Sequence, residues 1–221
     1  MKTNSKILIP ITFIAFALRV YALDFQPLWG DEGWSFYFAC MPIVDMIHLT
    51  ALDIHPPLYY LILHGWFMIA GITSEMGRFV SVICGTLLIP IVYQLAHVIE
   101  SNHTISKVSG VGGVLAAFIT AINPMAIYYS QEVRMYGLVT LLGTMSMLAF
   151  VHFLRGNQKA KWAYIIVTTL SLYTMYYAIF IVIAQGIYVL IRATKNWRVK
   201  AFMIKPDRFL ETCQVLNITS F

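Results

Sequence analysis

Two clusters of polar residues stand out in a chain that is otherwise strongly apolar. The first is the adjacent carboxylate pair Asp31 and Glu32, which lies between glycines and tryptophans in residues 28–34. The glycines keep the backbone open to a close ligand and free of helix preference. The second cluster, residues 128–136, reads Tyr-Tyr-Ser-Gln-Glu-Val-Arg-Met-Tyr. Charged residues make up only 11% of the sequence, so both clusters are candidate functional sites. For the first, a solvated loop carrying two acids is the alternative.

Three arginines stand apart from the other basic residues, because each lies at the end of an apolar segment. They are Arg19, Arg78 and Arg134. A lone arginine at a membrane interface usually serves as an anchor that reaches toward water. Three of them converging on acid-rich loops better suit recognition of a phosphate group, whose oxygens match the planar guanidinium fork.

The composition defines the class of protein. The chain has 221 residues, of which 59% are hydrophobic, and this indicates a polytopic membrane protein. The net charge of +5 does not indicate nucleic-acid binding, because the basic residues fall between apolar segments and form no binding motif. The cysteines Cys40, Cys84 and Cys213 are odd in number and lack metal-ligand spacing, so we expect neither a disulfide framework nor a zinc site.

Hydropathy predicts six crossings of the membrane, with the amino terminus in the cytoplasm. Four of them lie at about residues 6–25, 79–98, 110–128 and 136–154. A single helix over residues 162–191 would be about 45 Å long, which exceeds the thickness of a bilayer core. It would also place the basic segment that follows it outside. We therefore predict two short helices that turn near residues 173–177.

The segment between the first two crossings, about residues 26–77, is predicted to be a long outer loop with short interfacial helices. Its longest apolar run, residues 58–71, is shorter than the roughly 20 residues that a spanning helix needs. If this run does not cross, the later basic clusters fall inside, as the positive-inside tendency requires. If it does cross, they all fall outside. The residues that decide this are Lys107, Arg155, Lys159 and Lys161.

The predicted fold is thus an all-α polytopic membrane module over residues 1–192. Residues 193–221 form a basic cytoplasmic tail, which we interpret as a truncated ending. Twelve of the 15 Lys and Arg residues are then cytoplasmic, and the three arginines named above are the exceptions. Seven of the ten acids lie on the same outer face as those arginines. We expect a multi-pass protein of the cell membrane with an extracytoplasmic active face.

Several motifs in order make the chain similar to a known family. They are residues 28–32, Asp-Ile-His-Pro-Pro-Leu-Tyr-Tyr at 53–60, Gly-Arg-Phe at 77–79, Asn-Pro at 123–124 and the cluster at 128–136. Together they resemble the amino-terminal membrane module of GT-C glycosyltransferases. The similarity is to the protein mannosyltransferase and aminoarabinose transferase superfamily, in its RgtA/B/C/D-like branch, and it covers about residues 7–192.

The resemblance implies a membrane glycosyltransferase that moves a sugar from a polyprenyl-phosphate donor to a lipid, glycan or protein acceptor outside the cytoplasm. Such transfer needs a base for the acceptor proton and positive charge on the departing phosphate. Asp31 is the expected base, with Glu32 or Glu132 assisting. A divalent metal held by Asp31 and Glu132 is an open alternative, and we expect these two acids to approach each other. The expected donor-binding residues are Arg78, Arg134, His55, Arg19, Tyr129 and Gln131.

Two other functions are weighed against the transferase. A non-catalytic donor-binding subunit or a truncated, inactive remnant would keep the same outer face. Met175 stands where the family often has a histidine, and family members usually continue with further helices, which keeps this alternative open. A small transporter would place ionisable residues near the centres of its spans, and the sequence has almost none there.

Overall fold

The computed structural model describes residues 2–100 and 110–203, and the regular secondary structure in these ranges is helical. The elements are α1 (Lys2–Val20), α2 (Gly30–Ala39), α3 (Ile43–Thr50), α4 (Leu58–Ala70), α5 (Ser74–Glu100), α6 (Val111–Ile122), α7 (Pro124–Tyr128), α8 (Tyr136–Leu154), α9 (Gln158–Thr174), the 3₁₀ helix η1 (Tyr176–Ala178) and α10 (Ile179–Met203). The predicted all-α fold is confirmed.

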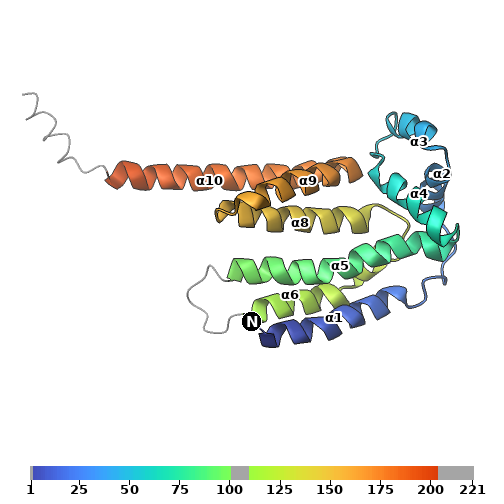
Figure 1. Ribbon diagram of the computed structural model, residues 1–221, viewed down its shortest axis with the longest axis horizontal. Coiled ribbons are helices and arrows are strands. Elements are labelled where there is room, and N and C mark those ends of the chain that lie inside the picture. Colours follow the sequence, from blue (N-terminus) through green and yellow to red (C-terminus); the bar gives the residue numbers. More distant parts are fainter. Residues whose placement is uncertain (1, 101–109, 204–221) are drawn as a thin grey trace, which may run out of the picture. The chain divides into compact units, whose positions relative to one another are not determined.

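The helix α5 is the centre of the first compact unit, residues 1–179. It contacts α1, α6 and α8, and α9 packs along α8 (Figure 1). Close packing of α5 depends on small residues. A Cβ atom at Gly85 would lie 2.9 Å from Arg19 Nε and would clash with the Ser130 hydroxyl. The bundle therefore holds polar side chains directly against the α5 backbone.

The helices α2, α3 and α4 form a cap, residues 21–73, at one end of this bundle (Figure 1). Its core contains the fully buried side chains of Met46, Tyr59, Tyr60 and Leu63. At 1.5 Å per residue, the 13 residues of α4 span about 20 Å, less than the roughly 30 Å of a bilayer core. The predicted short helix is confirmed, and its position outside the membrane stays a prediction.

Within the described residues, three helices are long and apolar enough to cross a membrane. They are Ser74–Glu100, Tyr136–Leu154 and Tyr176–Thr194, and α4 and α6 are shorter apolar helices. These findings agree with a polytopic membrane protein, while the number of six crossings stays a prediction. The expected crossing at 110–128 is divided in two, because the Asn123 side chain accepts a hydrogen bond from Ala126 N and Pro124 starts the new helix α7.

The expectation that the glycines around the acid pair disfavour a helix is wrong. Helix α2 begins at Gly30, so Asp31 and Glu32 occupy its first turn. Carboxylates are stabilised there by the unpaired N–H groups and the positive end of the helix dipole. In addition, Trp29 N donates to the Glu32 carboxylate, at 3.4 Å. Local capping by the acids thus outweighs the helix penalty of the glycines.

The predicted interruption near residues 173–177 is confirmed. Helix α9 ends at Thr174, and Met175 adopts an extended conformation with φ −158° and ψ 128° before η1 begins. Residues 180–221 form a second unit, which the structure describes as far as Met203. Its helix α10 continues past residue 192 to Met203, and the expected module boundary at 192 stays a prediction.

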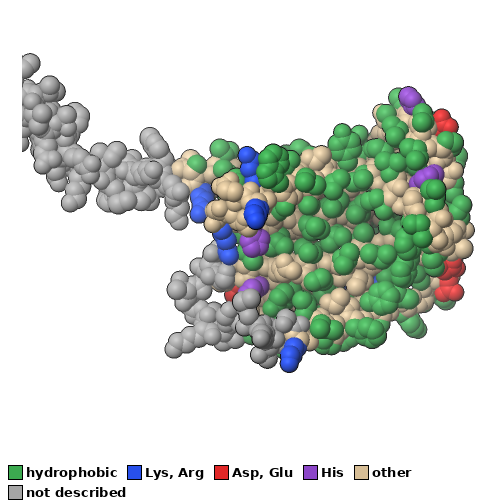
Figure 2. All heavy atoms as spheres, in the orientation of Figure 1, with side chains coloured by type: hydrophobic (Ala, Val, Ile, Leu, Met, Phe, Trp, Pro, Cys, Tyr) green, Lys and Arg blue, Asp and Glu red, His purple; other side chains and the backbone are tan. Residues whose placement is uncertain are grey.

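Charge is distributed unevenly between the two ends of the first unit. Acidic side chains gather at the cap end (Figure 2). Helix α8 leads away from the cap end, and α9 returns toward it, so the connection between them lies at the opposite end. Arg155, Lys159 and Lys161 are in or next to this connection. The bundle therefore separates most of its acids from these basic residues along the helix axes, while Glu100, the last residue of α5, lies at the basic end.

Candidate active site

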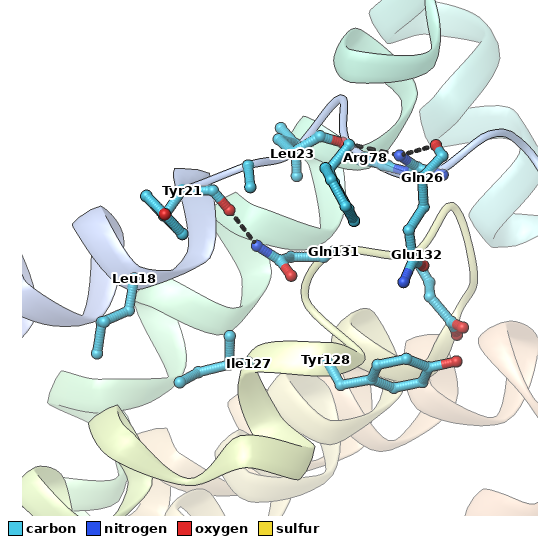
Figure 3. Close-up of a pocket in the computed structure, with 11 residues that line it drawn as sticks. Leu18, Tyr21, Leu23, Gln26, Arg78, Ile127, Tyr128, Gln131 and Glu132 are labelled. Carbon is cyan, nitrogen blue, oxygen red and sulfur yellow. Dashed lines mark hydrogen bonds between the residues drawn. The ribbon is translucent and has the colours of Figure 1, made fainter.

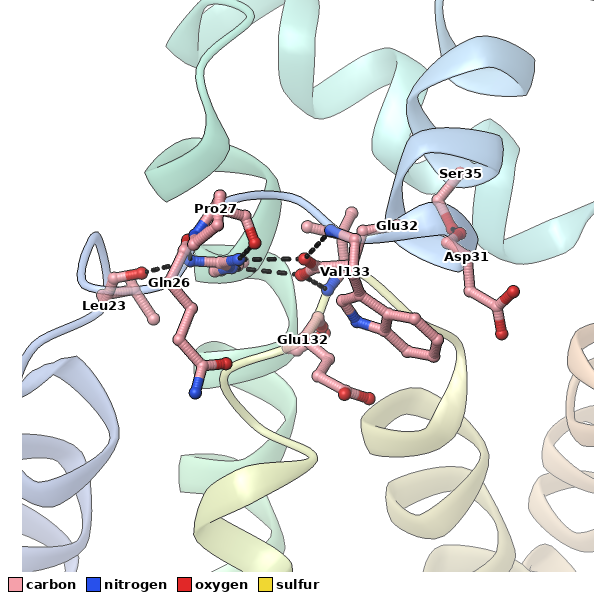
Figure 4. A network of polar contacts seen from close by, with 11 residues as sticks. Leu23, Gln26, Pro27, Asp31, Glu32, Ser35, Glu132 and Val133 are labelled. Carbon is pink, nitrogen blue, oxygen red and sulfur yellow. Dashed lines mark hydrogen bonds and ion pairs between the residues drawn. The ribbon is translucent and has the colours of Figure 1, made fainter.

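The buried ion pair between Glu32 and Arg78 joins α2 to the first turns of α5 (Figure 4). Glu32 is fully buried and Arg78 is 3% exposed. Arg78 Nε donates to Glu32 Oε1 at 3.0 Å, and Nη2 donates to Oε2 at 2.9 Å. This is the bidentate geometry in which a guanidinium binds a carboxylate most strongly.

The remaining donors of Arg78 bind backbone carbonyl groups between α1 and α2. Nη1 donates to Leu23 O at 2.7 Å and to Gln26 O at 2.8 Å, and Nη2 donates to Pro27 O at 3.4 Å. With the two bonds to Glu32, all five N–H donors of the guanidinium are in use. The phosphate-binding role expected for Arg78 stays a prediction, and these contacts favour a positioning role.

Glu32 also fixes the loop before α8. Its Oε1 accepts a hydrogen bond from Val133 N at 2.9 Å, although the two residues are 101 positions apart. The carboxylate thus holds α2, α5 and this loop together. A catalytic role for Glu32 stays a prediction. A carboxylate that already accepts several hydrogen bonds is better suited to positioning other groups than to taking a proton from the acceptor substrate.

Arg19 is fully buried among α1, α6 and the loop before α8. Its Nη1 donates to Ala15 O at 2.9 Å and to Ala121 O at 3.1 Å, and its Nη2 donates to Thr120 O at 3.2 Å. Its Nε donates to Ser130 Oγ at 3.2 Å. A cation at the last turn of α6 stabilises the helix by capping its free carbonyl groups. Its expected contact with phosphate stays a prediction.

Gln131 and Tyr129 also make contacts within the protein. Gln131 Nε2 donates to Tyr21 O at 2.8 Å, which ties the loop before α8 to the end of α1. The Tyr129 ring lies edge-on to Tyr136, with 5.0 Å between the ring centroids. The donor-binding roles expected for these two residues stay predictions.

Asp31 has surroundings quite different from those of its neighbour Glu32. Its side chain is 47% exposed, and its Oδ2 lies 3.6 Å from Arg134 Nη2. Arg134 Nη1 also donates to Asp31 O at 3.2 Å, and the guanidinium lies over the Tyr136 ring at 5.6 Å. Arg134 Nε has no hydrogen-bond partner within the described part of the chain. Arg134 therefore keeps donor capacity that Arg78 lacks.

Asp31 and Arg134 line a cavity of about 320 Å³, which we call the Asp31 cavity. Its full lining is Asp31, Trp34, Phe38, Asp53, Ile54, His55, Tyr60 and Arg134. His55 Nδ1 lies 3.3 Å from Asp53 Oδ2, so the carboxylate orients the imidazole. Burial raises the pKa of Tyr60 to about 12, so its hydroxyl stays protonated and can donate a hydrogen bond. The cavity thus unites two carboxyl groups, a guanidinium and an imidazole.

Glu132 does not line the Asp31 cavity. It lines a second cavity together with Arg78 and Gln131. The negative charge of Asp31 raises the pKa of Glu132, but it is one of the weaker causes of that shift. The described residues contain no group of three His, Cys, Asp or Glu placed to hold a metal ion. The metal ion held by Asp31 and Glu132, and the expected approach of these two acids, stay predictions.

The sequence reasoning did not name Asp53, Tyr60 or Trp34 as site residues. A signal for Asp53 was present, because it precedes His55 by two positions in the Asp-Ile-His-Pro-Pro segment. On a turn, a carboxylate can contact a side chain two positions further along the chain. Tyr60 and Trp34 reach the cavity from α4 and α2, and no local pattern singles them out from the other aromatic residues.

Comparison with known proteins connects this site to a family. Residues 54–205 match the family described as dolichyl-phosphate-mannose-protein mannosyltransferase. The chain belongs to this family. The resemblance to GT-C glycosyltransferases is confirmed, and at this level the protein is a mannosyltransferase-like membrane glycosyltransferase. No curated protein and no solved structure matches the chain. The matched region of this family member includes His55, Arg78 and Arg134, whereas Asp31 precedes it.

Proposed function

We propose that this protein transfers a sugar from a polyprenyl-phosphate donor to a lipid, glycan or protein acceptor on the extracytoplasmic side, with Asp31 as general base. The main support is the different placement of the two adjacent acids. Glu32 is buried and saturated by Arg78, whereas Asp31 keeps a half-exposed carboxylate at a cavity beside Arg134. Family membership supports the reaction class.

In this mechanism the acceptor hydroxyl gives its proton to Asp31 while its oxygen forms a bond to the anomeric carbon of the sugar. The bond between that carbon and the phosphate oxygen breaks, and polyprenyl phosphate leaves with the electron pair. Arg134 stabilises the negative charge on the leaving phosphate. Because His55 Nδ1 already donates to Asp53, His55 would donate a hydrogen bond from Nε2 to the sugar or the phosphate when both ring nitrogens carry protons.

The Glu32–Arg78 pair acts as the positioning element of this site. It fixes the first turn of α2, which carries Asp31, against α5 and against the loop that carries Arg134. The relative placement of base and phosphate ligand therefore depends on a buried contact that need not touch the substrate. Catalytic geometry of this kind must be held to a fraction of an ångström.

The cap end is proposed to face the extracytoplasmic side. The basic residues of the α8–α9 connection lie at the opposite end, where the positive-inside tendency places the cytoplasm. A donor whose lipid stays in the bilayer would present its phosphate at the level of the cap. The Asp31 cavity lies at this level, because its lining comes from α2, the α3–α4 connection, α4 and the loop before α8.

A transfer assay on protein reconstituted in liposomes tests the role of Asp31. With polyprenyl-phosphate mannose as donor and a membrane lipid extract as the source of acceptors, Asp31→Asn should lower kcat about 10²–10⁴-fold, since the amide cannot accept the proton. Donor binding, measured by equilibrium titration, should change little. The matched control is Asp45→Asn, an exposed acid in the first turn of α3 that lies outside the cavity.

The same assay distinguishes an active transferase from a non-catalytic donor-binding subunit. Retention of full turnover by Asp31→Asn would remove the general-base assignment. If the wild-type protein binds the donor but never consumes it with any acceptor fraction, the non-catalytic donor-binding subunit becomes the preferred function.

A further inference from the structure

A second cavity of about 330 Å³ lies beside the Glu32–Arg78 pair (Figure 3). We call it the Glu132 cavity. It shares no lining residue with the Asp31 cavity, so it is a separate site. Its lining includes Tyr21, Phe25, Arg78, Tyr128, Gln131 and Glu132.

Glu132 is a buried acid that forms no ion pair within the described residues. It is 6% exposed, and its Oε2 has no hydrogen-bond partner among the described residues. Its backbone carbonyl is held by Ser81 Oγ at 2.6 Å, and the Tyr128 hydroxyl lies beside the carboxyl group in Figure 3. Burial raises the pKa of Glu132, because the carboxylate is removed from water.

Arg78 lines the same cavity but does not neutralise Glu132. Its five donors are taken up by Glu32 and by three backbone carbonyl groups. Gln131 Nε2 is likewise engaged with the carbonyl groups of Tyr21 and Arg19. The cavity therefore offers hydrogen-bond acceptors and a carboxylate, with few donors of its own. An anion such as phosphate would be repelled here.

The remaining lining suits an organic cation. Tyr21, Phe25 and Tyr128 contribute aromatic rings, whose faces attract cations. A carboxylate forms its strongest hydrogen bonds with charged donors. A neutral polyol could occupy the acceptors, but it would leave the buried charge without compensation, which is unfavourable.

The cavity is also accessible from the level of lipid headgroups. It lies just beyond Val20, where the apolar helix α1 ends, and Tyr21 and Phe25 are strongly exposed. Aromatic side chains are typical of the membrane interface. We propose that the Glu132 cavity binds a primary ammonium group, supplied by an aminolipid headgroup or by a free amine, with Glu132 as its counter-ion. This site is independent of the sugar-transfer proposal.

Native mass spectrometry of the protein with matched lipids tests this site without any sugar donor. Phosphatidylethanolamine should be retained about tenfold more strongly than phosphatidylcholine or phosphatidylglycerol of the same acyl chains. Phosphatidylcholine carries a cation that cannot donate a hydrogen bond, and phosphatidylglycerol carries hydroxyl groups on an anion. Glu132→Gln should abolish the preference. The control Asp24→Asn, an exposed acid of the same segment that does not line the cavity, should keep it.

Competition with free ethanolamine distinguishes the two sources of the ammonium group. Displacement of phosphatidylethanolamine by ethanolamine supports a lipid headgroup, and binding of ethanolamine without any lipid preference supports a soluble amine. The proposal is overturned if the wild-type protein prefers neither the aminolipid nor ethanolamine. It is also overturned if Glu132→Gln, folded by its thermal unfolding curve, binds as the wild type does, or if phosphatidylglycerol is preferred.

Discussion

Arg134 and Arg78 are both buried arginines beside a carboxylate, yet they differ in what they can bind. Arg78 has no free donor, whereas Arg134 lines the Asp31 cavity and its Nη2 lies 3.6 Å from Asp31 Oδ2, too far for a full hydrogen bond. We therefore assign the phosphate to Arg134. Arg134→Ala should weaken donor binding by about 1.5–3 kcal/mol, or roughly 10- to 150-fold in Kd.

Equilibrium titration of a polyprenyl-phosphate donor measures this loss directly. Lys159→Ala, at an exposed basic position of the opposite end, is the control and should leave the Kd unchanged. Equal loss of donor binding in Arg134→Ala and Asp31→Asn would show that the two side chains do not have separate roles as phosphate ligand and base.

The raised pKa of Glu132 leads to a stability prediction with a definite sign. The folded-state pKa lies above the unfolded value, so the folded protein is penalised once pH rises through that interval and the carboxyl group ionises. Glu132→Gln is neutral at all pH values. In amine-free detergent its Tm should exceed that of the wild type at pH 8, and the difference should shrink on acidification. A Tm difference that grows toward low pH would contradict a raised pKa.

For individual residues, the sequence indicated which polar side chains matter but not which of them pair with each other. Asp31 and Glu32 are adjacent and chemically alike, and only the rotation of α2 directs one into the protein and the other to the cavity. Arg78 is saturated by carbonyl groups of an irregular segment, and such contacts leave no periodic signal. Residue identity therefore indicated candidate chemistry, and tertiary packing decided which side chains remain available for it.

Among the helices, α5 leaves no room for a side chain at Gly85, where it packs against Arg19 and Ser130. Gly85→Ala would place a Cβ atom against Ser130 Oγ and Arg19 Nε, which should cost about 1–3 kcal/mol of stability. Gly65→Ala in α4 is a matched control, because no atom lies within 4 Å of its Cβ position. That change should be neutral or stabilising by about 0.5–1 kcal/mol, as alanine favours helices.

Thermal unfolding of both variants in the same detergent measures the contrast. An unchanged Tm for Gly85→Ala would show that Arg19 and Ser130 can move apart without loss, and the close approach would then have no structural role.

The helical elements themselves were largely predictable, because long apolar runs and proline positions are local features. The short helix α4 and the break before η1 follow from run length and from the span limit. The helix at the acid pair did not follow, since glycine content argued against it and the capping contacts of Glu32 are visible only in three dimensions.

For the molecule as a whole, the separation of charge predicts its orientation. Cysteine at Gln158, in the first turn of α9, should react only with reagents that reach the cytoplasm. Cysteine at Ala51, an exposed position after α3, should be labelled from outside. The two variants are compared by treating intact cells with an impermeant maleimide. Labelling of position 158 from outside would contradict the predicted orientation. The predicted topology also places Ser106 in the cytoplasm, and this residue lies outside the described residues.

The saturation of Arg78 also bears on how the protein is made. An arginine entering the bilayer without partners costs up to about 2.5–3.5 kcal/mol by insertion scales. All the groups that bind Arg78 precede α5 in the chain, so each has left the ribosome before this helix is inserted. The first turn of α5 can therefore be neutralised during synthesis, with no wait for α6 or α8. Glu32→Gln should then lower the amount of protein that reaches the membrane in pulse-labelled cells, and the defect would arise during biogenesis, before any substrate is met.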